Sequence, residues 1–154
     1  MRSANQSRSL RVLVPILLVL LALQFEFGMA VNLAGPPSLA PFGFSLAALS
    51  AALGQAGTLA VIHAVLGGLL VILSVLAWVL SLASKVRTLQ VFGSLAFLST
   101  VLAASTGLLF VLSGFQNDGD SHGMATNFIL AFAFYFLELY FLKPGDRPDR
   151  SRRL

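Results

Sequence analysis

The chain has 154 residues, of which 57% are hydrophobic and 10% are charged. Soluble domains carry about 25% charged residues, so this composition excludes an ordinary soluble domain and predicts an integral membrane protein. The absence of cysteine excludes disulfides, thiolate metal sites and thiol catalysis, while the net charge of +4 raises the question of nucleic-acid binding.

The N-terminal segment, residues 1–11, is polar and basic, and residues 12–34 form a first apolar run long enough to cross a bilayer. Pro15 is expected in the first turn of this helix, where proline is tolerated. A cleaved signal peptide is the alternative, because a basic start followed by an apolar core is also its pattern. The length of the run, and Glu26 where a cleavage site needs small residues, favour a retained helix.

A loop is expected over residues 35–57, because Gly-Pro-Pro and a further proline interrupt any helix there. Within it, residues 44–53 form a short apolar piece that predicts an interfacial helix or a lid. The second span, residues 58–83, has no charge and one histidine. His63 shares a helical face with small and polar residues, which predicts that it faces other helices. An ionisable group at membrane depth is a functional-site hypothesis.

A tight turn, residues 84–88, leads to a third span at residues 89–115, whose small residues recur every seven positions. Residues 116–123 predict a polar loop, and the aromatic-rich residues 124–142 a fourth span. Residues 143–154 form a basic tail. The pattern therefore predicts an all-α fold, an integral membrane four-helix bundle.

The distribution of positive charge predicts the orientation of this bundle. All ten Lys and Arg residues lie in the N-terminal segment, the 84–88 turn or the C-terminal tail, and the loops at 35–57 and 116–123 have none. The positive-inside rule places both termini in the cytoplasm of a cell-membrane protein. Topology thus explains the basic residues, and nucleic-acid binding is set aside.

The two histidines are expected near the outer face, His63 about 7–8 Å below the start of its span and His122 at the start of the fourth. Imidazoles on two facing helices are the ligands that bis-histidine haem needs. Gly67 and Gly107 would leave room for a porphyrin edge.

Two other interpretations of the histidines stay open. They can be a structural pair that only makes hydrogen bonds. They can also be part of a Zn or Cu site that recruits Asp118, Asp120 or Glu26, although a tight motif such as HxxxH is missing. We expect a hydrogen bond from the second ring nitrogen of His122 to Asp118, Asp120 or the backbone of its loop.

Four segments resemble the four-helix repeat of haem A synthases: LQFEFGMAVNLAG, IHAVLGGLLVILSVLAWVLS, VRTLQVFGSLAFLSTVLAASTGLLF and SHGMATNFILAFAFYFLELY. The resemblance covers residues 18–142 as one repeat instead of two, and it implies histidine ligands early in the second and fourth helices. The family's catalytic Glu-x-x-His-Arg is missing, since Ala60 and Ala64 stand at its Glu and Arg positions. The family's outer cysteine pair is missing too, so the resemblance implies haem binding without the methyl-oxidation chemistry.

The sequence therefore predicts a membrane protein that binds haem b through His63 and His122. It would serve in one-electron transfer or as an accessory haem protein, with membrane lipid, a quinol or a respiratory redox partner, and a second copy of the chain as candidate partners. One alternative is a haem-free structural subunit of a membrane complex. Another is a compact haem A synthase-like oxidoreductase in which Glu26 handles protons.

Overall fold

The computed structural model describes residues 2–34 and 39–142, with side chains from Arg8 onward. The predicted basic tail, residues 143–154, lies outside the described residues. The elements of the fold are five helices in that part of the chain: α1 (Arg2–Ala34), α2 (Leu46–Ala56), α3 (Thr58–Ala83), α4 (Arg87–Leu112) and α5 (Asp118–Phe141). All but α2 are long and apolar enough to cross a membrane. The all-α fold is confirmed, and the chain has the helices of a multi-pass membrane protein.

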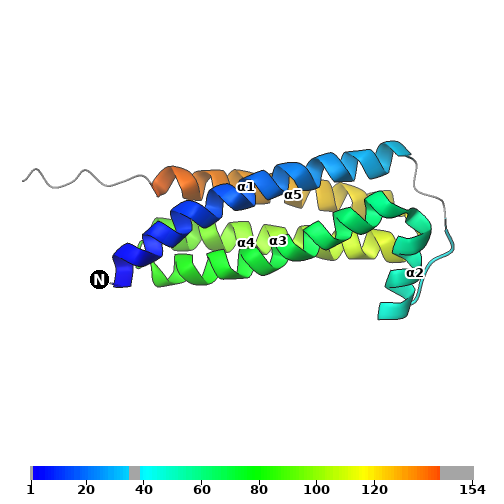
Figure 1. The fold of residues 1–154 in the computed structure, drawn as a ribbon, viewed down its shortest axis with the longest axis horizontal. Coiled ribbons are helices and arrows are strands. Elements are labelled where there is room, and N and C mark those ends of the chain that lie inside the picture. The colour runs from blue at the N-terminus through cyan, green and yellow to red at the C-terminus, as the bar shows by residue number, and fades with distance from the viewer. Residues whose placement is uncertain (1, 35–38, 143–154) are drawn as a thin grey trace, which may run out of the picture.

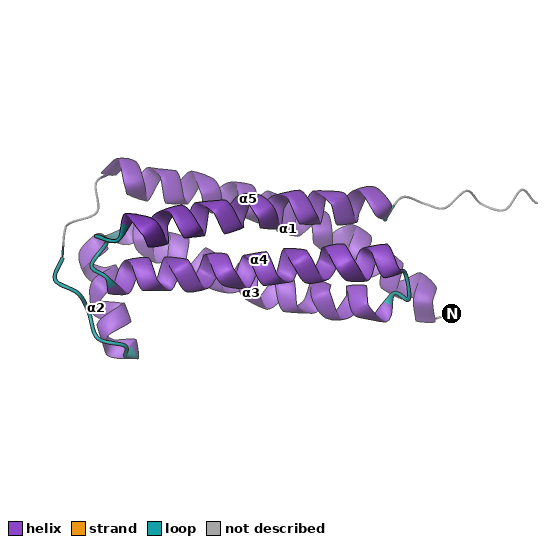
Figure 2. Cartoon of the chain, turned by 180° about the vertical axis from the view of Figure 1, so that it is seen from behind, coloured by secondary structure: helices purple, strands orange, loops and turns teal. Residues whose placement is uncertain are grey.

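The four long helices run antiparallel and pack side by side (Figures 1 and 2). α1 packs on α3, α3 on α4, α4 on α5, and α5 returns to α1. α1 is therefore diagonal to α4, and α3 is diagonal to α5. The short helix α2 lies across one end of the bundle, against α3 and α4 (Figure 1).

The inside of the bundle is small and partly polar, whereas its outside is large and apolar. Val65, Ile72 and Ile129 are each more than 60% exposed. Ala77, Ala96 and several serines are buried instead. This distribution suits lipid, because small residues let helix backbones approach closely while bulky side chains meet acyl chains.

Each end of the bundle is tied by its own hydrogen bonds. At the basic end, Arg11 Nε donates to the Leu142 carbonyl at 2.9 Å and joins the first long helix to the end of the last. At the opposite end, Leu39 N donates to the Gly114 carbonyl at 3.1 Å, and Phe42 N to the Leu112 carbonyl at 2.8 Å. The segment before α2 is therefore fastened to the end of α4.

Two local expectations are wrong. α1 begins at Arg2, so Pro15 lies in the helix interior and not in a first turn. The expected loop over residues 116–123 is helical from Asp118. Asn117 caps that helix, since its Oδ1 accepts from Gly119 N at 3.1 Å. Acidic side chains in the first turn also favour a helix start there, through the helix dipole.

Candidate functional site

His63 faces α1 across the α1–α3 interface. Its Nε2 lies 3.1 Å from Gln24 Nε2, while His63 Nδ1 and Gln24 Oε1 are buried and have no hydrogen-bond partner in the described part of the chain. The two ends of an amide are assigned from the hydrogen-bond network. Turning the Gln24 amide pairs its oxygen with the Nε2–H group of His63, which satisfies the buried oxygen. His63 thus bonds to Gln24 through Nε2, one of the two ring nitrogens that can bind a metal.

Two glycines make this contact possible. A Cβ on Gly28 of α1 would lie 2.9 Å from His63 Cε1, and a Cβ on Gly67 of α3 would lie 3.1 Å from Gln24 Nε2. Each helix therefore offers a glycine, and the other helix places a polar side chain over it. We call these four residues the α1–α3 clasp. The space expected at Gly67 for a porphyrin edge holds the Gln24 amide.

α4 and α5 meet in a similar way, with a glycine of each helix facing a side chain of the other. A Cβ on Gly107 would lie 3.0 Å from Met124 Sδ, and a Cβ on Gly123 would lie 3.2 Å from Thr106 Cγ2. The second space expected to admit a porphyrin edge is therefore covered by the Met124 side chain.

His122 lies on the opposite side of its helix from the bundle interior. It is exposed, and it shares a face with Ile129 and Phe136, which are 63% and 57% exposed. Its Nδ1 lies 2.9 Å from the Asp118 carbonyl oxygen, one of the partners expected from the sequence. That bond fixes the tautomer in which Nδ1 carries the proton and leaves the lone pair on Nε2.

The contacts of the described residues do not bring the two imidazoles together. α3 and α5 are diagonal, His63 is turned toward α1, and His122 faces outward. In this arrangement they do not fit bis-histidine ligation of haem. Axial ligation stays a prediction that requires both rings to turn.

A Zn or Cu site finds little support in the same region. Within residues 8–34 and 39–142, no three His, Asp or Glu side chains gather closely enough to hold a metal ion. Asp120 instead accepts a hydrogen bond from Asn117 Nδ2 at 2.8 Å, beside the cap of α5.

Glu26 lies on the outward face of α1. It is exposed, and exposed apolar side chains at successive spacings of three or four residues continue its face on both sides: Val19 61%, Leu23 45%, Met29 41% and Leu33 80%. We call these five residues the Glu26 stripe. The Glu26 carboxyl, the candidate for proton handling, is thus turned away from the bundle.

The sequence reasoning missed Glu138, a carboxyl in α5 with no exposed surface. Its Oε1 makes a very short hydrogen-bond contact with Ser81 Oγ on α3, and its Oε2 is buried without a partner among the described residues. A Cβ on Gly93 of α4 would lie 2.6 Å from Ser81 Oγ, so only glycine leaves room for the contact. The rule that singles out Glu26, an ionisable group within a span, also singles out Glu138.

Tyr135 continues this polar layer one turn away on α5. It is 1% exposed, and its hydroxyl lies close to the Ser74 and Thr100 hydroxyls without meeting hydrogen-bond geometry. Thr100 and Ser74 donate to carbonyls of their own helices. The layer joins α3, α4 and α5 at the basic half of the bundle. The Tyr135 hydroxyl and Glu138 Oε2 have no hydrogen-bond partner within the residues that the structure describes.

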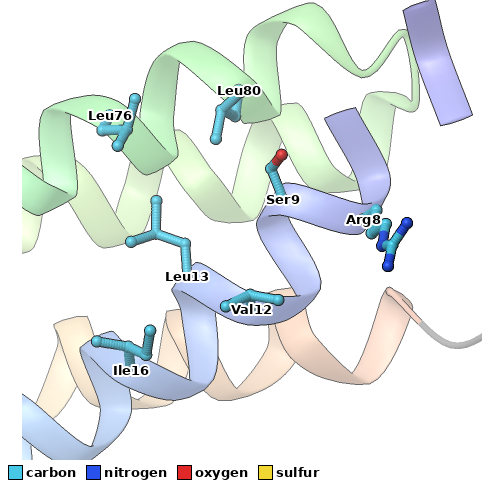
Figure 3. A pocket seen from close by; sticks show the side chains of 7 residues that line it. All are labelled: Arg8, Ser9, Val12, Leu13, Ile16, Leu76 and Leu80. Carbon is cyan, nitrogen blue, oxygen red and sulfur yellow. The ribbon is translucent and has the colours of Figure 1, made fainter. Parts of the chain in front are cut away.

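An open groove between α1 and α3 lies at the basic end (Figure 3). Its lining is mostly aliphatic, with Arg8 and Ser9 at its head. Leu80, in its wall, is 17 residues from His63 along α3, about 25 Å at 1.5 Å per residue. The groove is separate from the residues expected to bind haem.

Comparison of the chain with protein-family models, with curated protein sequences and with solved structures found no match.

Proposed function

We propose that this protein is a haem-free structural subunit of a membrane complex, which it joins through the Glu26 stripe on the outer half of α1. The observation that carries the proposal is the exposed carboxyl of Glu26 on a face that is otherwise apolar. His63 supports it, because its contacts with Gln24 and Gly28 give the histidine a structural role without iron.

The depth of Glu26 in the membrane is the reason to expect a partner helix. Glu26 lies eight residues before the end of α1, about 12 Å along the axis, within a hydrocarbon layer of about 30 Å. A carboxyl that meets acyl chains there is costly unless another group bonds to it. The expected partner is a transmembrane helix that brings a hydrogen-bond donor or a basic side chain against the stripe. A second copy of this chain is one candidate for that helix.

Native electrophoresis of gently solubilised membranes tests the proposal. The tagged protein should migrate in an assembly larger than one chain. Glu26→Leu should release the single chain, while Glu26→Gln should retain part of the assembly because an amide still bonds. Val65→Leu, an apolar change at a 69% exposed position of α3, is the matched control and should change nothing. A wild-type protein that migrates as one chain would overturn the proposal.

Haem b binding is the rival proposal, and one observation favours it. The bond from His122 to the Asp118 carbonyl leaves Nε2 as the acceptor, which is how metal-bound histidines are commonly oriented. This proposal keeps the resemblance to haem A synthases as its second support. It requires His63 to exchange Gln24 for iron, and an absorbance spectrum decides between the two proposals.

We also propose that the basic end of the bundle faces the cytoplasm, in a cell membrane. The ends of α1 and α5 that are joined by Arg11 lie at this end, as does the turn with Lys85 and Arg87. Asp118 and Asp120 lie at the other. Positive charge concentrated at one end supports a cytoplasmic position for it.

A further inference from the structure

We propose that Glu138 and Ser81 form a buried proton-binding site, in which the Glu138 carboxyl carries an exchangeable proton and donates a hydrogen bond through it to Ser81 Oγ. The proposal rests on the contact between α5 and α3 across the centre of the bundle. The site is independent of the subunit role proposed for the Glu26 stripe.

The number of donors at Ser81 limits where the proton can lie. Ser81 Oγ lies 2.7 Å from the Ala77 carbonyl oxygen and is also in contact with Glu138 Oε1. A hydroxyl has one proton, and a carbonyl has none. If Ser81 donates to Ala77, the bond to Glu138 needs a proton on the carboxyl. The chain of bonds then runs from Glu138 to Ser81 to Ala77, and each acceptor has its donor.

The other surroundings of the Glu138 carboxyl also favour its protonated form. Within residues 8–34 and 39–142, Ser81 is the hydrogen-bonding partner of the Glu138 carboxyl, and Oε2 has none. An ionised carboxylate with an unpaired oxygen in an apolar interior is costly, whereas the protonated acid loses much less by leaving water. Gly93 is packed against both groups, which leaves no space for a metal cation between them.

In the part of the chain that the structure describes, the elements packed against Glu138 bring few charged or titratable groups to its carboxyl. On α5, Tyr135 is the neighbouring titratable group. From α1, Arg11 reaches the Leu142 carbonyl, one turn beyond Glu138. α3 contributes the neutral Ser81, and α4 contributes Gly93. Glu138 lies three residues before the end of α5, about 5 Å along the axis, so the basic end is the nearer end of the bundle for exchange of its proton.

The composition of the chain makes a direct test practical. Glu26 and Glu138 are its two glutamates. Cell-free synthesis of Glu26→Gln with glutamate labelled by ¹³C at the side-chain carboxyl leaves Glu138 as the labelled acid, with no change at the site itself. Infrared spectroscopy of this protein in lipid vesicles then separates the carbonyl stretch of a protonated carboxyl from the bands of a carboxylate.

We expect the protonated band at neutral pH, a downshift of that band in heavy water, and its replacement by carboxylate bands as the pH is raised. Ser81→Ala should shift the band upward, because the carboxyl loses its acceptor. Ser74→Ala, at an equally buried serine two turns away on α3, should leave it in place. Carboxylate bands at neutral pH would overturn the proposal, as would a band that Na⁺ removes at constant pH. A band that heavy water never shifts would show a sealed carboxyl and overturn the exchange.

Discussion

At the scale of single residues, the polar groups of this bundle are placed by glycines. Gly28 and Gly67 receive the His63 ring and the Gln24 amide, and Gly93 receives the Ser81 hydroxyl. A hydrogen bond inside a membrane contributes only about 0.6–2 kcal/mol, so close packing around it matters as much as the bond itself. His63 therefore holds α1 against α3 by fit as well as by polarity.

The α1–α3 clasp predicts that alanine lowers the stability at Gly28 but not at Gly68. Gly28→Ala puts a methyl 2.9 Å from the His63 ring, and the crowding, about 1–3 kcal/mol, outweighs the gain in helix propensity of about 1 kcal/mol. The melting temperature in detergent should fall. Gly68→Ala is the control, because its methyl meets nothing within 4 Å, and it should be neutral or stabilising.

A double mutant shows whether the His63 ring causes the loss of stability expected in Gly28→Ala. In a His63→Ala background the ring is gone, so Gly28→Ala should cost much less than it does in the wild type. Equal costs in both backgrounds would mean that the clasp does not hold the helices together.

At the scale of elements, the ends of helices differ most from the sequence-based expectation. α5 begins at Asp118 because Asn117 caps it, a signal that is present in the sequence but was outweighed by the polar composition of residues 116–123. The end of α4 depends on a long-range contact instead. Gly114 has φ +72°, and its would-be Cβ lies 2.1 Å from the Leu39 carbonyl oxygen. Sequence periodicity cannot predict such a contact.

Gly114→Ala should therefore loosen the end of the bundle opposite the basic end. The positive φ costs about 1–2 kcal/mol for a residue with a side chain, and the methyl also displaces the Leu39 carbonyl. Hydrogen exchange should rise at Leu39 N and Phe42 N, whose bonds end on this turn. Gly43→Ala, which meets nothing within 4 Å, is the control. Unchanged protection of both amides would contradict the role of the turn.

At the scale of the whole molecule, the apolar runs were enough to predict the all-α fold and helices that can span a membrane. They could not predict where side chains point. The spacing of His63 correctly placed it against another helix, but that helix is α1, and no pattern in the sequence identifies it. Glu26 and Glu138 have similar sequence surroundings, yet one faces outward and the other is fully buried. The difference arises from the rotation of each helix in the assembled bundle.

The shared basic end predicts a labelling pattern. The chain has no cysteine, so one cysteine at a time can be introduced. Val86→Cys, in the turn between α3 and α4, should react with a membrane-impermeant maleimide only after cells are opened. Gln55→Cys, at the other end in α2, should react in intact cells. The reverse pattern would invert the orientation, and labelling of both from outside would refute a four-span topology.

The most direct test of the account is a reduced-minus-oxidised absorption spectrum of the protein purified from membranes of cells that are supplied with haem. The proposed subunit role, with His63 held by Gln24 and Gly28, predicts no haem bands in stoichiometric amount. A low-spin b-type spectrum at one haem per chain, lost equally in His63→Ala and His122→Ala, would contradict it and establish the axial pair.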